Sequence, residues 1–165
     1  MKVCFTLLLL VPFAQAANPP VKSVPFTVPE ARQPEIPDIS LLRLETSRCF
    51  TTCPAFTVSI RRDGSFSYQG EDAVERLGEY QGQVERGELE QILRYVGEIG
   101  FMDLENRYSS PFLDNGGITL TVVQGGKSKT VESAAGSGPA TLWALTKLID
   151  GLLERATWEL PGRER

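Results

Sequence analysis

Short runs in which apolar and polar residues alternate fill the first half of the folded region. Such a period of two is typical of β-strands with one buried face. Three runs follow one another along the chain, at 42–44, 56–60 and 66–68. Asp63-Gly64 lies between the second run and the third, and an Asp-Gly pair in that position predicts a tight β-hairpin.

More strands are predicted downstream. A weaker strand region is expected over 74–84, with Gly78 as a turn or bulge. The run 118–122 alternates again, and the Gln-Gly-Gly at 124–126 predicts a turn. The chain then returns over 127–132 as a polar edge strand.

Two segments change to the helical period. The apolar residues of 86–99 fall on one face of a helix that ends at Gly100, and 140–157 forms a second helix with Pro139 in its first turn. Hairpins combined with two separate helices predict an α+β fold, in which an antiparallel sheet of hairpins carries two amphipathic helices packed on one face.

The first sixteen residues have the features of a secretory signal peptide. Lys2 precedes a short apolar run, and the A-x-A sequence at 14–16 is a cleavage site. The apolar run is too short to cross a membrane, which takes about 20 residues. We therefore expect an exported protein, periplasmic or secreted, with no membrane span after cleavage of residues 1–16.

The mature chain divides into three parts. Residues 17–39 contain six prolines, which predict an extended Pro-rich spacer. The α+β domain is expected over 40–158, a length sufficient for one hydrophobic core. A polar tail follows over 159–165.

The composition excludes several classes of function. The formal net charge of the 165 residues is −4, so no basic excess exists to neutralise phosphates, and we expect no nucleic-acid partner. The chain has no histidine, which excludes His-based triads, His general acids and bases, and most catalytic zinc or copper sites. We therefore expect no cofactor, no metal site and no catalytic residue.

One motif carries chemical content. The segment Cys-Phe-Thr-Thr-Cys-Pro at 49–54 holds the two cysteines that remain after signal cleavage, Cys49 and Cys53. A spacing of four can bring two Cα atoms to about 6 Å in a helical turn, within reach of a disulfide, and an exported protein folds in an oxidising compartment. We expect a structural disulfide. A thiol redox pair, a soft-metal site such as Cu(I), and two free buried thiols are the alternatives.

The redox alternative resembles the copper chaperones of the thioredoxin fold, which carry Cys-x-x-x-Cys-Pro. That family uses a distant His as a third ligand and places a helix after the second Cys, where the helix dipole lowers the thiol pKa. This chain has no His, and a strand is predicted over 55–61. Both departures count against the analogy.

The chain resembles more closely an uncharacterised family of bacterial envelope domains, a domain of unknown function with a Cys-Phe-Gly-Thr-Cys-Pro hallmark. The likeness covers nearly all of Leu42 to Ile149, and Thr51 stands where the family has Gly. The resemblance implies a small α+β envelope domain and supplies no activity. The matching pieces are 49–54, 56–60, Asp63-Gly64, Tyr68-x-Gly70, Gly78, Tyr108, 119–121, 125–127 and 148–150.

Carboxylates and tyrosines complete the set of candidate residues. Glu71 with Asp72, and the oxygen-rich segment at 114–117, offer carboxylates for hydrolysis or ion binding, although solvated turns have the same composition. Four tyrosines are candidates for an aromatic binding surface or for core and rim positions: Tyr68, Tyr80, Tyr95 and Tyr108.

The sequence therefore predicts an exported, non-catalytic binding or accessory module with one disulfide, acting on an unknown ligand or envelope partner. The alternative is a thiol redox or copper-handling protein that uses Cys49 and Cys53. A hydrolase that works with carboxylates alone is a third, weaker hypothesis.

Overall fold

A computed structural model describes residues 35–50, 52–110, 116–134 and 137–160 of the chain. They belong to one compact unit, Gln33–Arg165. The predicted signal peptide, most of the predicted spacer, and residues 161–165 of the predicted tail lie outside the described residues. The elements follow in the order β1 (Ile39–Thr46), β2 (Ala55–Arg61), β3 (Ser65–Asp72), β4 (Gly78–Gln83), α1 (Arg86–Glu98), η1 (Phe101–Asp103), β5 (Arg107–Tyr108), β6 (Gly117–Gln124), β7 (Lys127–Ala134), α2 (Ala140–Glu154) and β8 (Thr157–Glu159).

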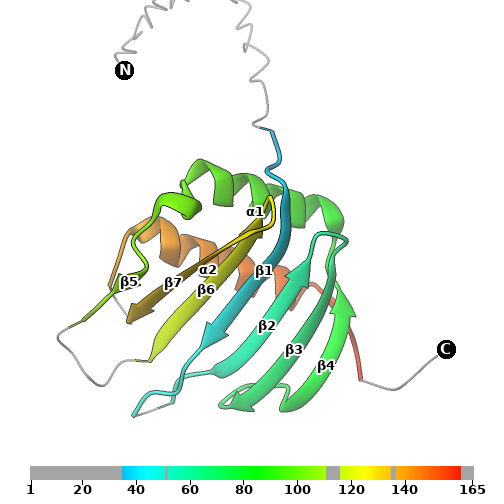
Figure 1. The fold of residues 1–165 in the computed structure, drawn as a ribbon. Coiled ribbons are helices and arrows are strands. Elements are labelled where there is room, and N and C mark those ends of the chain that lie inside the picture. The colour runs from blue at the N-terminus through cyan, green and yellow to red at the C-terminus, as the bar shows by residue number, and fades with distance from the viewer. Residues whose placement is uncertain (1–34, 51, 111–115, 135–136, 161–165) are drawn as a thin grey trace, which may run out of the picture. The chain divides into compact units, whose positions relative to one another are not determined.

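The strands form one eight-stranded sheet in the order β5-β7-β6-β1-β2-β3-β4-β8 (Figure 1). The fold is thus mixed α/β, with a mostly antiparallel sheet and two helices, which confirms the predicted sheet of hairpins in outline. The pairing of β5 with β7 is the exception, because these strands run parallel. β5 contains two residues, too few for an alternating pattern to reveal it.

The predicted hairpin turn joins β2 to β3. Gly64 has a φ of +87°, a conformation that glycine adopts without steric cost, and its N–H donates to the carbonyl of Arg61 over 2.9 Å. The carboxylate of Asp63 accepts from the backbone N–H of Ser65 at 2.9 Å. The Asp-Gly prediction is confirmed, and the turn fixes the register that pairs Ile60 with Phe66.

Two predicted boundaries are wrong. The strand expected over 74–84 begins only at Gly78, whose φ is +90°, so that the chain turns before it pairs. The last helix ends at Glu154, and β8 then pairs with β4 through Trp158 opposite Gly82. The apolar period could not separate these elements, because no Gly or Pro over 155–158 marks the end of the helix and only the pairing with β4 defines the strand.

The strand expected over 127–132 also differs from its prediction. It extends to Ala134 and is covered over two residues by β5, so it is not a free edge along its whole length. Its later residues Val131 and Ser133 are buried. β1 begins at Ile39, the last residue of the predicted spacer.

Strands and both helices contribute to one hydrophobic core. The two helices run antiparallel, because the Tyr95 hydroxyl of α1 donates to the carbonyl of Thr141 at the start of α2, over 3.2 Å, while Arg155 just after α2 bonds Glu88 at the start of α1 over 3.0 Å. Among the described residues, no helix has the length and apolar character needed to cross a membrane.

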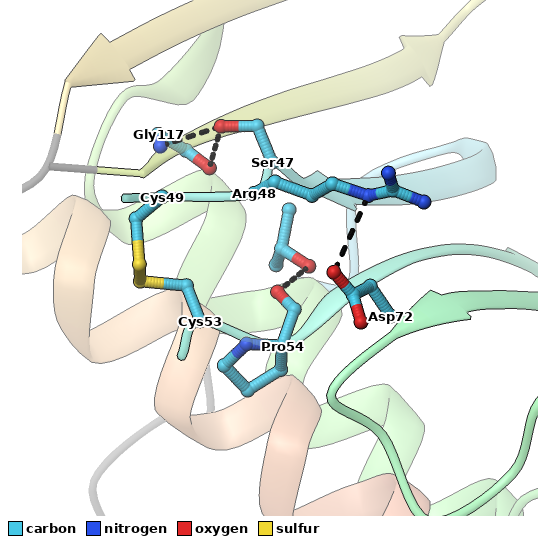
Figure 2. Close-up of a disulfide and its surroundings, with 8 residues drawn as sticks. Ser47, Arg48, Cys49, Cys53, Pro54, Asp72 and Gly117 are labelled. Carbon is cyan, nitrogen blue, oxygen red and sulfur yellow. Dashed lines mark hydrogen bonds and ion pairs between the residues drawn. A yellow bond between two sulfur atoms is a disulfide. The ribbon is translucent and has the colours of Figure 1, made fainter. Parts of the chain in front are cut away.

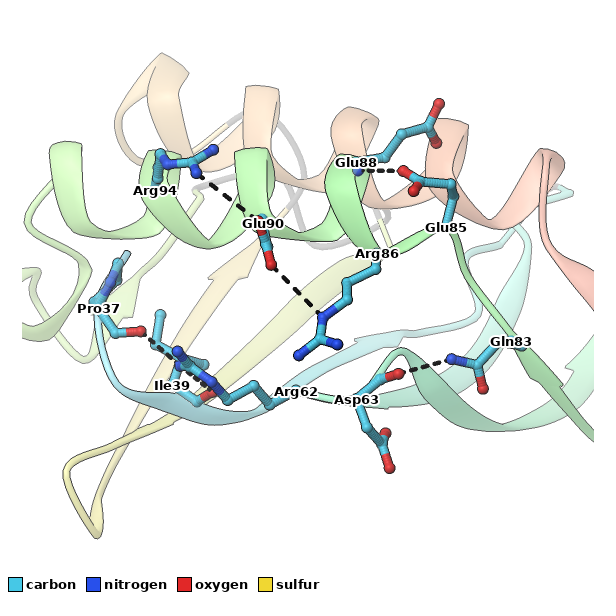
Figure 3. A network of polar contacts seen from close by, with 10 residues as sticks. All are labelled: Pro37, Ile39, Arg62, Asp63, Gln83, Glu85, Arg86, Glu88, Glu90 and Arg94. Atoms are coloured by element: carbon cyan, nitrogen blue, oxygen red, sulfur yellow. Dashed lines mark hydrogen bonds and ion pairs between the residues drawn. The ribbon is translucent and has the colours of Figure 1, made fainter. Parts of the chain in front are cut away.

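A network of polar contacts lies at the end of the sheet where α1 begins (Figure 3). The Glu85 carboxylate accepts from the backbone N–H of Glu88 over 2.6 Å and so caps α1. The side-chain amide of Gln83 donates to the carbonyl of Asp63 over 2.7 Å. Arg62 donates to the carbonyl of Pro37 over 3.0 Å. These bonds join the turn between β2 and β3 to the end of β4 and to the entry of β1, and they cap the start of α1.

Candidate functional site beside the disulfide

A groove of about 650 Å³ opens at the opposite end of the sheet. Its floor consists of inward-facing strand residues, Leu44, Phe56, Tyr68 and Ile118. This volume lies within the ~300–1,000 Å³ that is usual for small-ligand sites. A second hollow, lined by Ser59, Tyr80 and Gln81 among others, measures about 240 Å³.

One face of α2 forms a side of the groove. The residues that line it recur every three or four positions along the helix: Trp143, Thr146, Lys147, Asp150, Leu153 and Glu154. Neighbouring strands are about 4.8 Å apart and a helix is about 10 Å wide, so one helix covers only about two strands. The eight-stranded sheet is much wider than α2, so part of its apolar face beside α2 is left uncovered.

An aromatic cluster forms the far end of the groove. The Phe56 and Tyr68 rings stack with centroids 5.4 Å apart. Trp158 meets Tyr68 edge-to-face at 5.0 Å and Phe66 at 4.9 Å, and Tyr80 lies 6.0 Å from Trp158. These distances are in the range where aromatic pairs attract beyond simple burial. Burial raises the pKa of the Tyr68 hydroxyl, and the nearby Arg76 charge acts in the opposite direction.

Both tryptophans of the chain line the groove. The indole N–H of Trp143 donates to the carbonyl of Ser137 over 2.7 Å, and that of Trp158 donates to the carbonyl of Leu153 over 3.1 Å. Each ring is partly exposed, and its polar atom is already satisfied by backbone. The groove thus presents two oriented aromatic surfaces that need little ordering when a ligand arrives.

The loop over 73–76 brings an arginine onto one of these rings. Ala73 has a φ of +50° and is the one described non-glycine residue with a positive φ, a conformation that costs of order 1 kcal/mol. The loop then passes so close to Gly70 that a Cβ there would overlap the carbonyl oxygen of Arg76. As a result the Arg76 guanidinium lies 4.5 Å from the centroid of Trp158, a cation–π contact.

The disulfide stands at the rim of the groove. Cys49 and Cys53 are joined with an S–S distance of 2.03 Å and a Cα–Cα distance of 5.4 Å, so the expected bond is confirmed. The described residues around it are not helical, and the loop between β1 and β2 brings the sulfurs together instead of a helical turn. Cys53 and Pro54 line the groove directly.

Side chains on both sides hold the disulfide loop in place (Figure 2). The Ser47 hydroxyl accepts from the backbone N–H of Gly117 over 2.7 Å, and a Cβ at Gly116 would lie 2.6 Å from the Ser47 carbonyl. The Thr46 hydroxyl donates to the carbonyl of Pro54 over 2.8 Å and accepts from the N–H of Phe56 over 3.0 Å. The loop is therefore anchored to β6 and to β2.

The charged rim of the groove has a small acidic excess. Three carboxylates and two cations line it. Arg76 pairs with Glu75 at 3.0 Å, and Lys147 pairs with Asp150 at 2.9 Å. Glu154 is the third carboxylate, and it also acts on the neighbouring Arg155. The two ion pairs each have no net charge, so the carboxylate of Glu154 gives the groove lining a net charge of about −1.

The remaining candidate residues are dispersed. Asp72 forms an exposed ion pair with Arg48 at 3.6 Å, and Glu71 lies beside it on β3 with no place in the groove. Asp114 lies outside the described residues. Tyr95 bonds the start of α2, and Tyr108 packs against Gly138, so only two of the four tyrosines, Tyr68 and Tyr80, share the aromatic cluster. Within the described ranges, no group of three potential metal ligands comes together.

The family model described as "Domain of unknown function (DUF6438)" matches residues 40–153, a span that includes most of β1 and most of α2. The chain belongs to the DUF6438 family. No relative was found among curated proteins. The DUF6438 match ends at Leu153, so β8 and Trp158 of the groove lie beyond it.

The groove of this DUF6438 chain contains residues that sequence reasoning did not select. Arg76 and Trp158 bear no recognisable motif, because they meet only through the left-handed turn at Ala73 and the pairing of β8 with β4. The one available signal was the number of tryptophans. The chain has two, and in the structure both border the groove.

Proposed function

We propose that this DUF6438 protein is an exported, non-catalytic binding or accessory module of the bacterial envelope. The signal-like N-terminus and the oxidised cysteine pair support export. The observation that supports binding most strongly is the groove of about 650 Å³, with its two oriented tryptophans. Partly exposed aromatic rings held by backbone hydrogen bonds are typical of recognition surfaces.

The arrangement of the helices supports the same proposal. One continuous core contains residues of the central strands and of both helices, and the outward residues of the strands, such as Arg43, Ser59 and Gln81, are polar or charged. We infer that both helices cover the same sheet face. On that face, the groove is the place where apolar surface stays accessible to a ligand.

The disulfide has a structural part in this proposal. It holds the loop that carries Pro54 along the groove, and its reduction would release that loop. A catalytic role would need thiols that cycle with a partner. The position of Cys53 on the groove favours this thiol redox alternative as the second candidate. A partner bound in the groove would lie next to the disulfide and could exchange thiols with it.

Binding is tested by nuclear magnetic resonance with a panel of small aromatic and aliphatic amides, alcohols and amines. Each is added to the ¹⁵N-labelled mature protein, and backbone shifts are followed. We expect the shifts to cluster on groove residues, with Phe56 and Tyr68 among them. Shifts scattered over the polar sheet face, or none with any member of the panel, would contradict the proposal.

The redox alternative is separated by a second measurement. The wild-type protein is assayed for exchange of its disulfide with a thiol reductant, and the Cys49→Ser, Cys53→Ser double variant is titrated with the same panel. The structural reading predicts that the wild-type bond resists a glutathione buffer and that the double variant binds more weakly. A bond that cycles readily, together with unchanged fragment binding in the double variant, would favour the redox function.

A further inference from the structure

We propose that the groove receives a short peptide segment of a partner protein in which an arginine stands between apolar residues. This inference rests on the proposed function, since it names the occupant of the same groove. Three observations carry it: an arginine already lies on an aromatic ring of the groove, the rim has an acidic excess, and each of two loops that contribute to the groove also exposes one large apolar side chain.

The first observation is the position of Arg76. Its guanidinium lies 4.5 Å from the Trp158 centroid, with Glu75 at 3.0 Å as its ion-pair partner. The ring cluster around Trp158 thus already binds a guanidinium. The ring faces carry negative partial charge, and Arg is the cation found on them most often. The contact made by Arg76 therefore indicates that the aromatic side of the groove can bind a guanidinium group of a ligand.

The second observation is charge. Of the carboxylates on the groove, Glu75 and Asp150 have cationic partners within it, whereas Glu154 has none there. The neighbouring Arg155 is engaged with Glu88 at 3.0 Å. A ligand cation would therefore gain a carboxylate partner on the rim, and a ligand anion would meet this carboxylate as a repulsive charge.

The third observation indicates a polypeptide instead of a small molecule. Four large hydrophobic residues are exposed among the described residues, and two of them belong to the loops that border the groove. Phe50, in the disulfide loop, is 85% exposed, and Leu77, next to Arg76, is 63% exposed. Neither side chain lines the groove itself, but both loops contribute residues to it, and exposed apolar residues beside a groove are typical of interaction surfaces. A small cation inside the groove would leave both uncovered.

The charge preference is tested with three probes of nearly equal shape: benzamidinium, benzamide and benzoate. Binding is followed by intrinsic fluorescence, because both tryptophans line the groove. We expect benzamidinium to bind about three- to fivefold tighter than benzamide, the range of an exposed cation–π contact, and benzoate to bind most weakly. Equal binding of all three would overturn the cation preference while leaving the proposed binding function intact. No binding at the groove by these probes or by the fragment panel would overturn both.

Arg76 supplies a variant with a definite sign. Arg76→Gln removes the tethered cation, so benzamidinium is expected to bind about threefold tighter. If the groove instead recognised anions through Arg76, the same change would weaken benzoate binding and leave benzamidinium unaffected, which would contradict the proposal. Arg86→Gln makes the same change in net charge at an exposed side chain of α1 and is expected to alter neither affinity. Melting curves of both variants check that the fold is kept.

The peptide itself is tested as Ac-Leu-Arg-Phe-NH₂, with a matched peptide in which citrulline replaces the arginine and removes only the charge. The arginine peptide is expected to bind at least about threefold tighter than the citrulline peptide. Phe50→Ser should weaken the peptide and leave benzamidinium unchanged. Equal affinity for the two peptides would contradict the proposed preference for arginine. Binding of benzamidinium without binding of either peptide would contradict the proposal that the ligand is a polypeptide.

Discussion

The same four strands end in two very different environments. Across β1 to β4, one row of paired residues is Leu42, Ile60, Phe66 and Gly82, and these lie at what we name the closed end, next to the polar network of Figure 3. At the other end the row is Thr46, Phe56, Gly70 and Gly78, beside the disulfide of Figure 2, and this we name the open end.

The contrast indicates that one end of the sheet stabilises the fold, while the other end borders the proposed binding groove. At the closed end the large side chains Leu42, Ile60 and Phe66 are at most 2% exposed, and their burial stabilises the folded state. At the open end, Gly70 admits the backbone of Arg76 instead of packing a side chain. Phe56 at this end stays partly exposed, and the disulfide holds the loop.

The largest effect is expected at the closed end. Leu89→Ala empties a position in α1 that is 1% exposed, and such changes cost about 2–5 kcal/mol of unfolding free energy. Leu148→Ala is the matched control, because Leu148 is 42% exposed on α2; its expected effect is within about 0.5 kcal/mol. Urea denaturation measures both. A small loss for Leu89→Ala would show that the closed end is not the centre of stability.

Removal of the disulfide comes next. The Cys49→Ser, Cys53→Ser double variant opens a loop of about five residues, for which the chain-entropy model gives roughly 2 kcal/mol. The fold should persist, since the anchoring bonds of Thr46 and Ser47 remain. Thermal melting and mass spectrometry of the exported protein are the measurements. An unchanged melting temperature would assign the bond a task other than stability.

The Thr46 hydroxyl is expected to contribute less. Thr46→Val keeps the shape and removes the bonds to Pro54 and Phe56, at a cost of about 1 kcal/mol. Because Pro54 lines the groove, ligand affinity should fall together with stability. Thr57→Val, on the neighbouring outward strand position, is the control and should leave affinity unchanged. Parallel losses in both variants would argue against a specific role for the Thr46 bonds.

The left-handed turn at Ala73 gives a smaller change of opposite sign. Ala73→Gly relieves a φ of +50° and should stabilise the fold by up to about 1 kcal/mol. The cation–π contact of Arg76 should survive, and probe affinity should change little. A clear loss of stability would mean that the alanine methyl packs usefully in the groove wall.

The last prediction concerns acid. Hydrogen bonds from the backbone N–H groups of Gly87 and Glu88 lower the pKa of Glu85, and bonds from Ser65 lower that of Asp63. Depressed carboxyl pKa values give stability that is complete above the unfolded values of 4.5 and 3.8 and is lost as pH falls through the folded values. Glu85→Gln should flatten the fall in melting temperature below about pH 4.5. An unaltered profile would show that the cap has no electrostatic part.

The closed end could be predicted from the sequence far better than the open end. Alternation over 56–60 and 66–68 with Asp63-Gly64 between them defined the first hairpin, because local residues alone determine that turn. The helical period located α1 to within a residue. These features depend on neighbours in sequence, which a single chain displays.

The groove depends on contacts between distant residues. Gly70 and Gly78 become neighbours only once β3 and β4 pair, and Trp158 joins the cluster only once β8 pairs with β4. The cysteine spacing indicated the disulfide, while its place on the rim follows from the course of α2. Periodicity contains no information on where a helix leaves part of a sheet uncovered.

The most direct test of the account uses the indole N–H resonances of Trp143 and Trp158. Each is fixed by a hydrogen bond at the groove, and a Trp143→Phe variant assigns them. On titration with Ac-Leu-Arg-Phe-NH₂, both resonances should shift to saturation, while the amide of Leu89 at the closed end stays still. Motionless indole resonances, or shifts confined to the closed end, would contradict the claim that the open end is the binding site.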